Sequence, residues 1–163
     1  MAAVKVSDGA VKAASDLRVK AATPEEQKKS KKAVIFRLSD DLKSIIVDEG
    51  KEILVGDCDD TEDVFQKLRS KLPKDECRYV AFNVTYETHE NLYESLVFIL
   101  WVPESAPLRN KMIYESSKST LRQKIVGVKH EYQVNTHEEL CDRKSLVNKL
   151  RVSDVNSLEG KPV

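Results

Sequence analysis

Residues 96–102 (LVFILWV) constrain the fold more than any other segment, because all seven are apolar. A run of this length without polar alternation is typical of a strand that is covered on both faces. It contains Phe98 and Trp101, two large apolar side chains that can both be buried only if helices lie on each side of the sheet. We therefore expect this strand at the centre of a sheet that lies between helices, in an α/β fold.

Other apolar and β-branched runs predict the remaining strands. These runs lie at 33–38, 44–47, 53–55, 78–88 and 132–135, and the one at 53–55 is weak. The polar residues Ser39, Asp40 and Asp41 separate the first two runs, which indicates a hairpin.

Capping residues and prolines predict where the helices begin and end. A first helix is expected at about 9–19, with Ser7 or Asp8 as its N-cap. The other expected helical segments are a turn or exposed loop from Thr23 and Pro24, a helix from 64 to about 71 after the acidic stretch 57–63, a helix between Pro107 and Gly127, and a last helix or broken pair after Thr136. Residues 1–163 are expected to form one domain, with a short flexible N-terminal tail at about 1–6.

The composition argues against several classes of protein. The 27 basic and 27 acidic residues cancel, and a neutral chain is not expected to bind nucleic acid in general. Three histidines and five glycines, without a phosphate-binding loop or a nucleophile elbow, argue against an enzyme. The three cysteines never form Cys-x-x-Cys, so we expect no metal site, no cofactor and a reducing compartment. No apolar leader or membrane span is evident, which predicts a cytoplasmic or nuclear protein.

Positive charge is concentrated at 108–130, where six Lys or Arg accompany one Glu. On a helix, an arc of about 120° facing the core would contain Ile113, Tyr114, Ser117, Leu121, Ile125 and Val128. A group of basic side chains would lie immediately beside this arc, within about 40° of one another: Lys111, Lys118, Arg122 and, if the helix continues past Gly127, Lys129. These cations form either an ordinary solvated face or a ridge that binds carboxylates or phosphates.

Five segments of the chain resemble the actin-depolymerising factor/cofilin family. They are residues 53–57 (ILVGD), 101–107 (WVPESAP), 111–118 (KMIYESSK), 127–135 (GVKHEYQVN) and 157–162 (SLEGKP). The resemblance extends from Val6 to the C-terminus, and the basic stretch 28–32 with the C-terminal motif suggests an animal cofilin-like member. It implies a single actin-depolymerising-factor-homology domain with a central mixed sheet, no catalytic centre, and a protein that severs and depolymerises actin filaments.

The resemblance also implies four sets of surface residues. Contacts to both actin monomers and filaments would involve Val4, Lys5, Val6, Ser7, Arg109, Lys111, Met112, Ser117, Lys118 and Arg122. Filament-specific contacts would involve Arg78 and the loop residues Leu92, Tyr93 and Glu94. Inhibitory phosphoinositide headgroups would bind Lys111, Lys118, Arg122, Lys124, Lys129 and His130. Nuclear import would use Lys28, Lys29, Lys31 and Lys32, in a protein expected to be monomeric and cytoskeleton-associated.

Three departures from the family pattern affect these expectations. Leu92 and Tyr93 stand where the family often has a basic pair, so filament affinity is either reduced or supplied by apolar contact. No serine stands near residue 3, where the family is phosphorylated, and Ser7 is expected mainly to cap a helix. Ser95 replaces an acidic neighbour of His130, which predicts pH sensing that is shifted to lower pH or weaker.

Two further functions remain open at this point. One is a relative on the same fold that binds only actin monomers or a filament-nucleating complex. The other is a membrane adaptor whose main ligand is a phosphoinositide.

Overall fold

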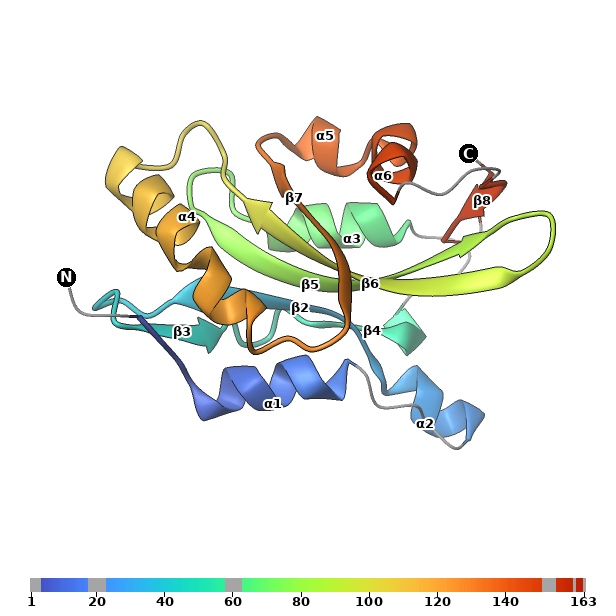
Figure 1. Ribbon diagram of the computed structural model, residues 1–163, viewed down its shortest axis with the longest axis horizontal. Coiled ribbons are helices and arrows are strands. Elements are labelled where there is room, and N and C mark those ends of the chain that lie inside the picture. The colour runs from blue at the N-terminus through green and yellow to red at the C-terminus, as the bar shows by residue number, and fades with distance from the viewer. Residues whose placement is uncertain (1–3, 18–22, 58–62, 151–154, 160, 163) are drawn as a thin grey trace.

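The chain folds around a curved mixed sheet whose longest hairpin is formed by β5 (Arg78–Glu87) and β6 (Leu92–Trp101) (Figure 1). The computed structural model describes residues 4–17, 23–57, 63–150, 155–159 and 161–162. Met1 to Ala3, the expected end of the first helix at 18–19, and most of the acidic stretch, with Cys58, lie outside these described residues.

The main path of the sheet runs in the order β1-β3-β2-β5-β6-β7. β1 pairs with β3 and β6 with β7 in parallel, and the other pairs on this path are antiparallel. The remaining strands have the bounds β1 (Lys5–Val6), β2 (Lys31–Leu38), β3 (Ser44–Val47), β4 (Ile53–Leu54), β7 (Val128–Val134), β8 (Ser157–Leu158) and β9 (Lys161–Pro162). This arrangement confirms the mixed sheet that the family resemblance implied.

Helices cover both faces of the sheet, as expected from the apolar run in β6. One face carries α1 (Asp8–Asp16) and α4 (Leu108–Arg122), and the other carries α3 (Val64–Lys71), α5 (His137–Leu140) and α6 (Arg143–Leu150). The short α2 (Pro24–Lys28) precedes β2, and Val55–Asp57 form a 3-10 turn. Phe98 is buried with the first group and Trp101 with the second, because successive side chains of a strand point to opposite faces. β6 lies one strand in from the β7 edge, so it is an interior strand but not the central one.

The capping residues predicted from the sequence are confirmed. The Ser7 hydroxyl accepts a hydrogen bond from Ala10 N at 3.1 Å, and the Thr23 hydroxyl accepts one from Glu26 N at 3.2 Å. Thr136 caps α5 in the same way, and Asp63, which the sequence analysis placed only in the acidic stretch before the helix, caps α3. Side-chain oxygens at these positions satisfy N–H groups that have no partner in the first turn of a helix.

Several element boundaries differ from the sequence predictions. β6 begins at Leu92, because backbone pairing with β5 continues after burial ends, so Leu92, Tyr93 and Glu94 lie in a strand and not in a loop. α4 ends at Arg122, five residues before Gly127, whose φ of 90° serves the turn that leads into β7. The expected flexible tail is wrong for residues 5 and 6, which pair with Ser44 and Ile45 as β1.

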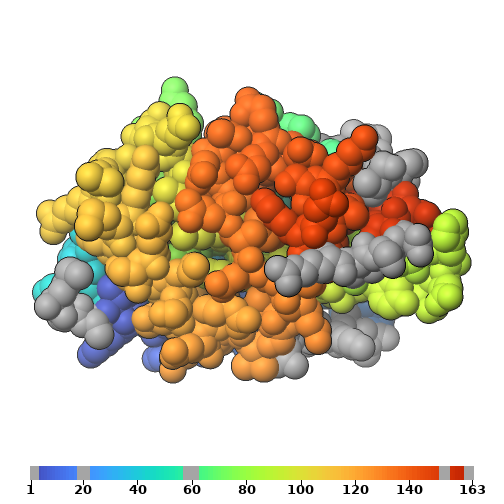
Figure 2. All heavy atoms as spheres, turned by 45° about the horizontal axis from the view of Figure 1, so that its top comes forward, coloured from blue at the N-terminus to red at the C-terminus, as the bar shows by residue number. Residues whose placement is uncertain are grey.

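The tip of the β5–β6 hairpin and helix α4 lie at opposite ends of the molecule (Figure 1). The space-filling view in Figure 2 shows the same separation, with the yellow-orange α4 at one end and the yellow-green hairpin tip at the other. β8 pairs with the outer end of β5, so the C-terminal segment lies beside the hairpin and away from α4.

Candidate functional site

Helix α4 is fixed to the sheet by Tyr114, which is buried on its inner face. The Tyr114 hydroxyl accepts a hydrogen bond from Leu38 N at 2.9 Å, and the Tyr79 hydroxyl donates to Tyr114 O at 2.7 Å. Their ring centroids are 5.0 Å apart. Burial raises the pKa of both tyrosines, so the two phenols remain neutral hydrogen-bonding groups. The outer face of α4 is therefore presented on a rigid support.

The outer face of the first two turns of α4 combines apolar and basic side chains. Leu108 is 73% exposed and Met112 is 61% exposed, and their i, i+4 spacing places them side by side. Arg109 is exposed, while the Lys111 ammonium donates to Glu104 O at 2.9 Å. We call Leu108, Arg109, Lys111 and Met112 the α4 patch. Leu108 was missed in the sequence analysis, although its position one turn before Met112 was a usable signal.

β1 lies beside α4, but only part of the predicted N-terminal contact set is accessible (Figure 1). Lys5 is exposed, whereas Val4 and Val6 are half-buried and pack against the core beneath α4. Ser7 is half-buried and occupied in capping α1. Val4 and Val6 hold β1 against the core, and Lys5, between them on the strand, lies on its exposed side. Residues 1–3, where members of the family carry a phosphorylated serine, lie outside the described residues.

The predicted basic ridge is shorter than expected and partly neutralised. Lys118 Nζ and Arg122 Nε each lie 3.4 Å from a different oxygen of Glu131, a residue of β7. Ser117 is buried, so its prediction as a surface contact is wrong in this structure. Because α4 ends at Arg122, Lys124 lies in the following turn and Lys129 in β7.

His130 lies on β7 next to Lys129, in register with Val97. It is half-buried. Ser95 is buried, and its hydroxyl lies 3.5 Å from the Tyr86 hydroxyl. Ser95 therefore has a structural partner within the sheet.

The residues predicted to contact only filaments do not form one surface. Leu92 is 68% exposed and Tyr93 is 39% exposed, and the Tyr93 ring stacks on Tyr86 with centroids 5.4 Å apart. Arg78 begins β5, in register with Trp101, whereas Glu87 ends β5, in register with Leu92. Nine residues separate Arg78 from Glu87, so Arg78 lies about 30 Å along the strand from the hairpin tip.

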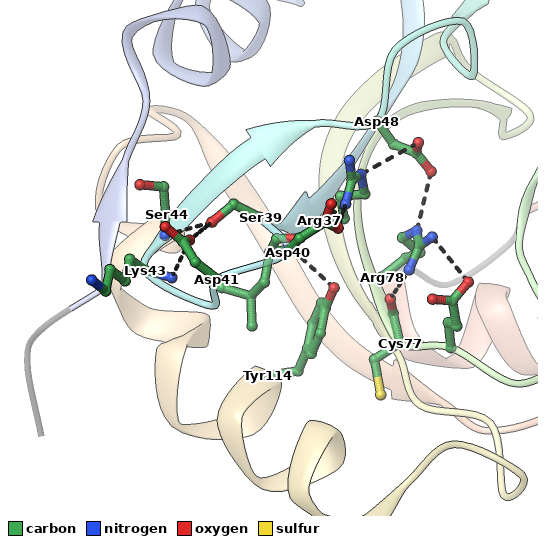
Figure 3. Close-up of polar contacts among 12 residues, drawn as sticks. Arg37, Ser39, Asp40, Asp41, Lys43, Ser44, Asp48, Cys77, Arg78 and Tyr114 are labelled. Atoms are coloured by element: carbon green, nitrogen blue, oxygen red, sulfur yellow. Dashed lines mark hydrogen bonds and ion pairs between the residues drawn. The ribbon is translucent and has the colours of Figure 1, made fainter.

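Arg78 is also engaged inside the protein. Its side chain is only 12% exposed, and it pairs with Asp48 at 3.1 Å and Glu76 at 3.5 Å (Figure 3). The same close-up shows Arg37 approaching Asp48 and Tyr114 reaching toward the strand that carries Arg37. The expected grouping of Arg78 with Leu92 and Tyr93 is wrong, because Arg78 ties the start of β5 to the residue after β3.

The basic stretch is divided between two elements. Lys28 and Lys29 are exposed at the end of α2, as a nuclear-import sequence would require. Lys31 pairs with Glu52 at 3.3 Å, and Lys32 is buried in β2 with Glu159 at 3.0 Å. The expectation of one exposed basic run is therefore wrong for Lys31 and Lys32.

Within the described part of the chain, no group of three or more His, Cys, Asp or Glu side chains is placed to hold a metal ion. Over the same residues, no helix has the length and apolar character that crossing a membrane would need.

The α4 patch is an exposed helix surface of mixed apolar and basic side chains on an α/β fold, a kind of surface suited to binding a partner. A family model described as cofilin/tropomyosin-type actin-binding protein matches residues 3–151, and the chain belongs to this family. The family consists of cytoskeletal actin-binding proteins that are not enzymes. This confirms two expectations from the sequence, that the protein is not an enzyme and that it is associated with the cytoskeleton.

Solved structures show the same fold. Cofilin from Streptomyces griseoflavus is 28% identical with a TM-score of 0.71, and the match covers 90% of this chain and 96% of that one. Actin depolymerization factor 2 from Plasmodium berghei is 23% identical with a TM-score of 0.71, covering 93% and 99%. Glia maturation factor from Caenorhabditis elegans is 14% identical with a TM-score of 0.66, covering 91% and 96%. Membership of the animal branch of the family stays a prediction, because these similar structures come from a bacterium, a protist and an animal.

Proposed function

We propose that this protein binds actin monomers and filaments through the α4 patch together with Lys5, Lys118 and Arg122. The carrying observation is the exposed pair Leu108 and Met112 beside Arg109 and Lys111. An amphipathic helix of this kind fits an apolar groove with an acidic rim, in which the apolar side chains supply contact area and the cations supply orientation. Residues 1–163 would act as one monomeric domain.

A second surface at the hairpin tip would contact the adjacent subunit of a filament. Leu92, Tyr93 and Glu94 form this surface in our proposal, and Arg78 is left out because it is paired inside the protein. Binding two subunits at once favours a filament geometry that differs from the bare filament. The resulting strain at the boundary between bound and bare filament promotes severing and depolymerisation.

Phosphoinositide headgroups would inhibit actin binding by competing for cations. The shared residues are Lys111, Lys118 and Arg122, with Lys124, Lys129 and His130 next to them. The exposure of Lys124 and Lys129 supports this proposal, since each basic side chain near an acidic leaflet contributes about 1 kcal/mol. Nuclear entry would depend on Lys28 and Lys29, which are the exposed part of the basic stretch.

The double variant Arg109→Ala/Lys111→Ala tests the proposed actin site. We expect binding of labelled actin monomers and filaments to be lost, because both charges are removed from the patch, while the thermal midpoint stays unchanged. Lys28→Ala/Lys29→Ala removes the same charge from α2 and should leave actin affinity intact. Equal affinity of the Arg109/Lys111 variant and the wild type would contradict the proposed site.

A protein that binds only actin monomers is the second candidate function. The separation of Arg78 from the hairpin tip favours it, because the tip then lacks the cation predicted to contact the filament. Leu92→Ser/Tyr93→Ser distinguishes the two functions, since it weakens filament binding but not monomer binding if the tip is a filament contact. A wild type that binds monomers but not filaments would establish the monomer-binding function, and equal filament binding by the wild type and the variant would show that the tip is not a filament contact.

A further inference from the structure

Glu131 on β7 pairs with two cations on the last two turns of α4. Lys118 and Arg122 are four residues apart and share one helix face, so both reach the same carboxylate. One oxygen lies 3.4 Å from Lys118 Nζ and the other lies 3.4 Å from Arg122 Nε. All three side chains are 37–40% exposed, so this cluster lies at the surface.

The contacts of Glu131 are of a kind that a partner can exchange. Arg122 Nε is a buried atom that makes no hydrogen bond within the described residues, although it lies within ion-pair distance of Glu131, and Arg122 Nη2 donates to Val128 O at 3.5 Å. The carboxylate is therefore held by charge more than by aligned hydrogen bonds. Exposed pairs of this type contribute little to stability, so breaking them leaves the fold intact.

The pairing changes the charge that α4 offers to an acidic partner. Lys118 and Arg122 would present two positive charges alone, but with Glu131 between them the cluster has a net charge of about one. In the described part of the chain, Arg109, Lys124 and Lys129 are exposed and have no ion pair. Glu131 therefore lowers the positive charge that Lys118 and Arg122 present, and leaves the charges of Arg109, Lys124 and Lys129 unpaired in the described residues.

We propose that Glu131 is an internal counter-ion that limits the affinity of α4 for carboxylates and phosphates of a partner. The inference rests on the proposed actin site, because Lys118 and Arg122 belong to it. A partner's acidic group gains these cations only by displacing Glu131 or by sharing them with it. Glu131 is thus a specificity residue that favours partners with dense negative charge over partners with a single carboxylate.

Glu131→Gln tests this role, because it keeps the shape of the side chain and removes its charge. We expect affinity for labelled actin monomers to rise about 3- to 10-fold at low ionic strength, with a smaller gain at high salt. Glu138→Gln, an exposed change of equal charge on α5, should have no effect. In a Lys118→Ala/Arg122→Ala background, Glu131→Gln should bring no gain, because the effect acts through these two cations.

A second ligand separates this inference from the proposed function. Inositol hexakisphosphate, titrated by calorimetry, reports the freeing of the two cations without actin, and its affinity should also rise in Glu131→Gln. If the wild type binds actin, an unchanged or lower actin affinity of the variant overturns the inference, since a lower value means that Glu131 positions the cations. If the wild type does not bind actin, the proposed function fails and inositol hexakisphosphate decides: a gain supports the inference and no gain overturns it.

Discussion

Leu108 has the largest exposed fraction of any large apolar side chain in the described part of the chain, at 73%. The solvent side of a helix rarely carries such a residue next to a second one, and Met112 lies one turn away. A pair of this kind contributes nothing to the core, which Tyr114 and Leu121 fill from the other side of α4. In the proposed function this pair contacts actin, and apolar anchors dominate the energetics of most interfaces.

Leu108→Ala should weaken actin binding about 5- to 30-fold, because truncation removes about 1–2 kcal/mol of apolar contact. The thermal midpoint should not change, since the side chain is exposed in the free protein. Val126→Ala is the matched control: Val126 is 62% exposed but lies in the turn after α4, outside the patch. A titration with labelled actin monomers measures both. Equal losses in the two variants would show that Leu108 has no special role.

At the scale of single elements, the C-terminal hairpin β8–β9 is held by a buried ion pair. Lys32 Nζ lies 3.0 Å from Glu159 Oε1, and the two side chains are only 8% and 9% exposed. Thr85 N donates to the same oxygen at 2.7 Å. Glu159 also has a φ of 53°, a conformation that non-glycine residues adopt at some cost. These contacts connect the C-terminal segment to β2 and β5.

Glu159→Gln should lower the free energy of unfolding by about 3–5 kcal/mol, because it leaves the Lys32 charge buried without a counter-ion. Glu52→Gln breaks the more exposed pair with Lys31, whose side chains are 27% and 33% exposed, and should cost less than about 1 kcal/mol. Urea unfolding followed by circular dichroism measures both values. Similar losses for the two variants would mean that burial of the Lys32 pair does not matter.

The predictability of each element depended on where its determinants lie in the chain. Local signals were sufficient for α1 and α3, since Ser7 and Asp63 cap helices that they directly precede. The predicted end of α4 and the predicted start of β6 were wrong, because both depend on backbone pairing between strands and not on the apolar pattern of the segment itself. Backbone pairing with β5 extends β6 to Leu92, and pairing with β6 draws residues from Val128 onward into β7.

The same limit applied to the candidate site. Arg109, Lys111 and Met112 could be placed on an exposed helix face from periodicity and the family resemblance. Ion pairs between elements could not be predicted, because neither Glu131 nor Asp48 is near its partner cations in the sequence. These pairs changed the interpretation of the ridge and removed Arg78 from the proposed second surface.

At the scale of the whole molecule, several titratable side chains are buried as neutral groups. Burial raises the pKa of Cys77 to about 11, from a usual value of 9.0. Burial likewise raises the pKa values of Tyr79, Tyr114 and Tyr132 above the usual 10.0. The unfolded chain ionises these groups first, so it binds fewer protons than the folded protein in alkaline solution. These groups therefore contribute fully to the free energy of unfolding only below about pH 9.

The thermal midpoint should fall steadily as the pH rises from about 9 to 11, because the folded state keeps protons that the unfolded state releases. Tyr132→Phe removes one of these groups and should make the fall less steep. Calorimetric scans at a series of pH values measure both slopes. A midpoint that stays constant or rises over this range would contradict the burial of these groups.

Co-sedimentation with preformed actin filaments is the most direct test of actin binding through α4 and the hairpin tip. Both proteins are quantified in pellet and supernatant over a range of concentrations of this chain. We expect the chain to pellet with filaments while actin in the supernatant increases, because both surfaces are engaged and filaments are shortened. A chain that stays in the supernatant and leaves the distribution of actin unchanged would contradict the proposed function.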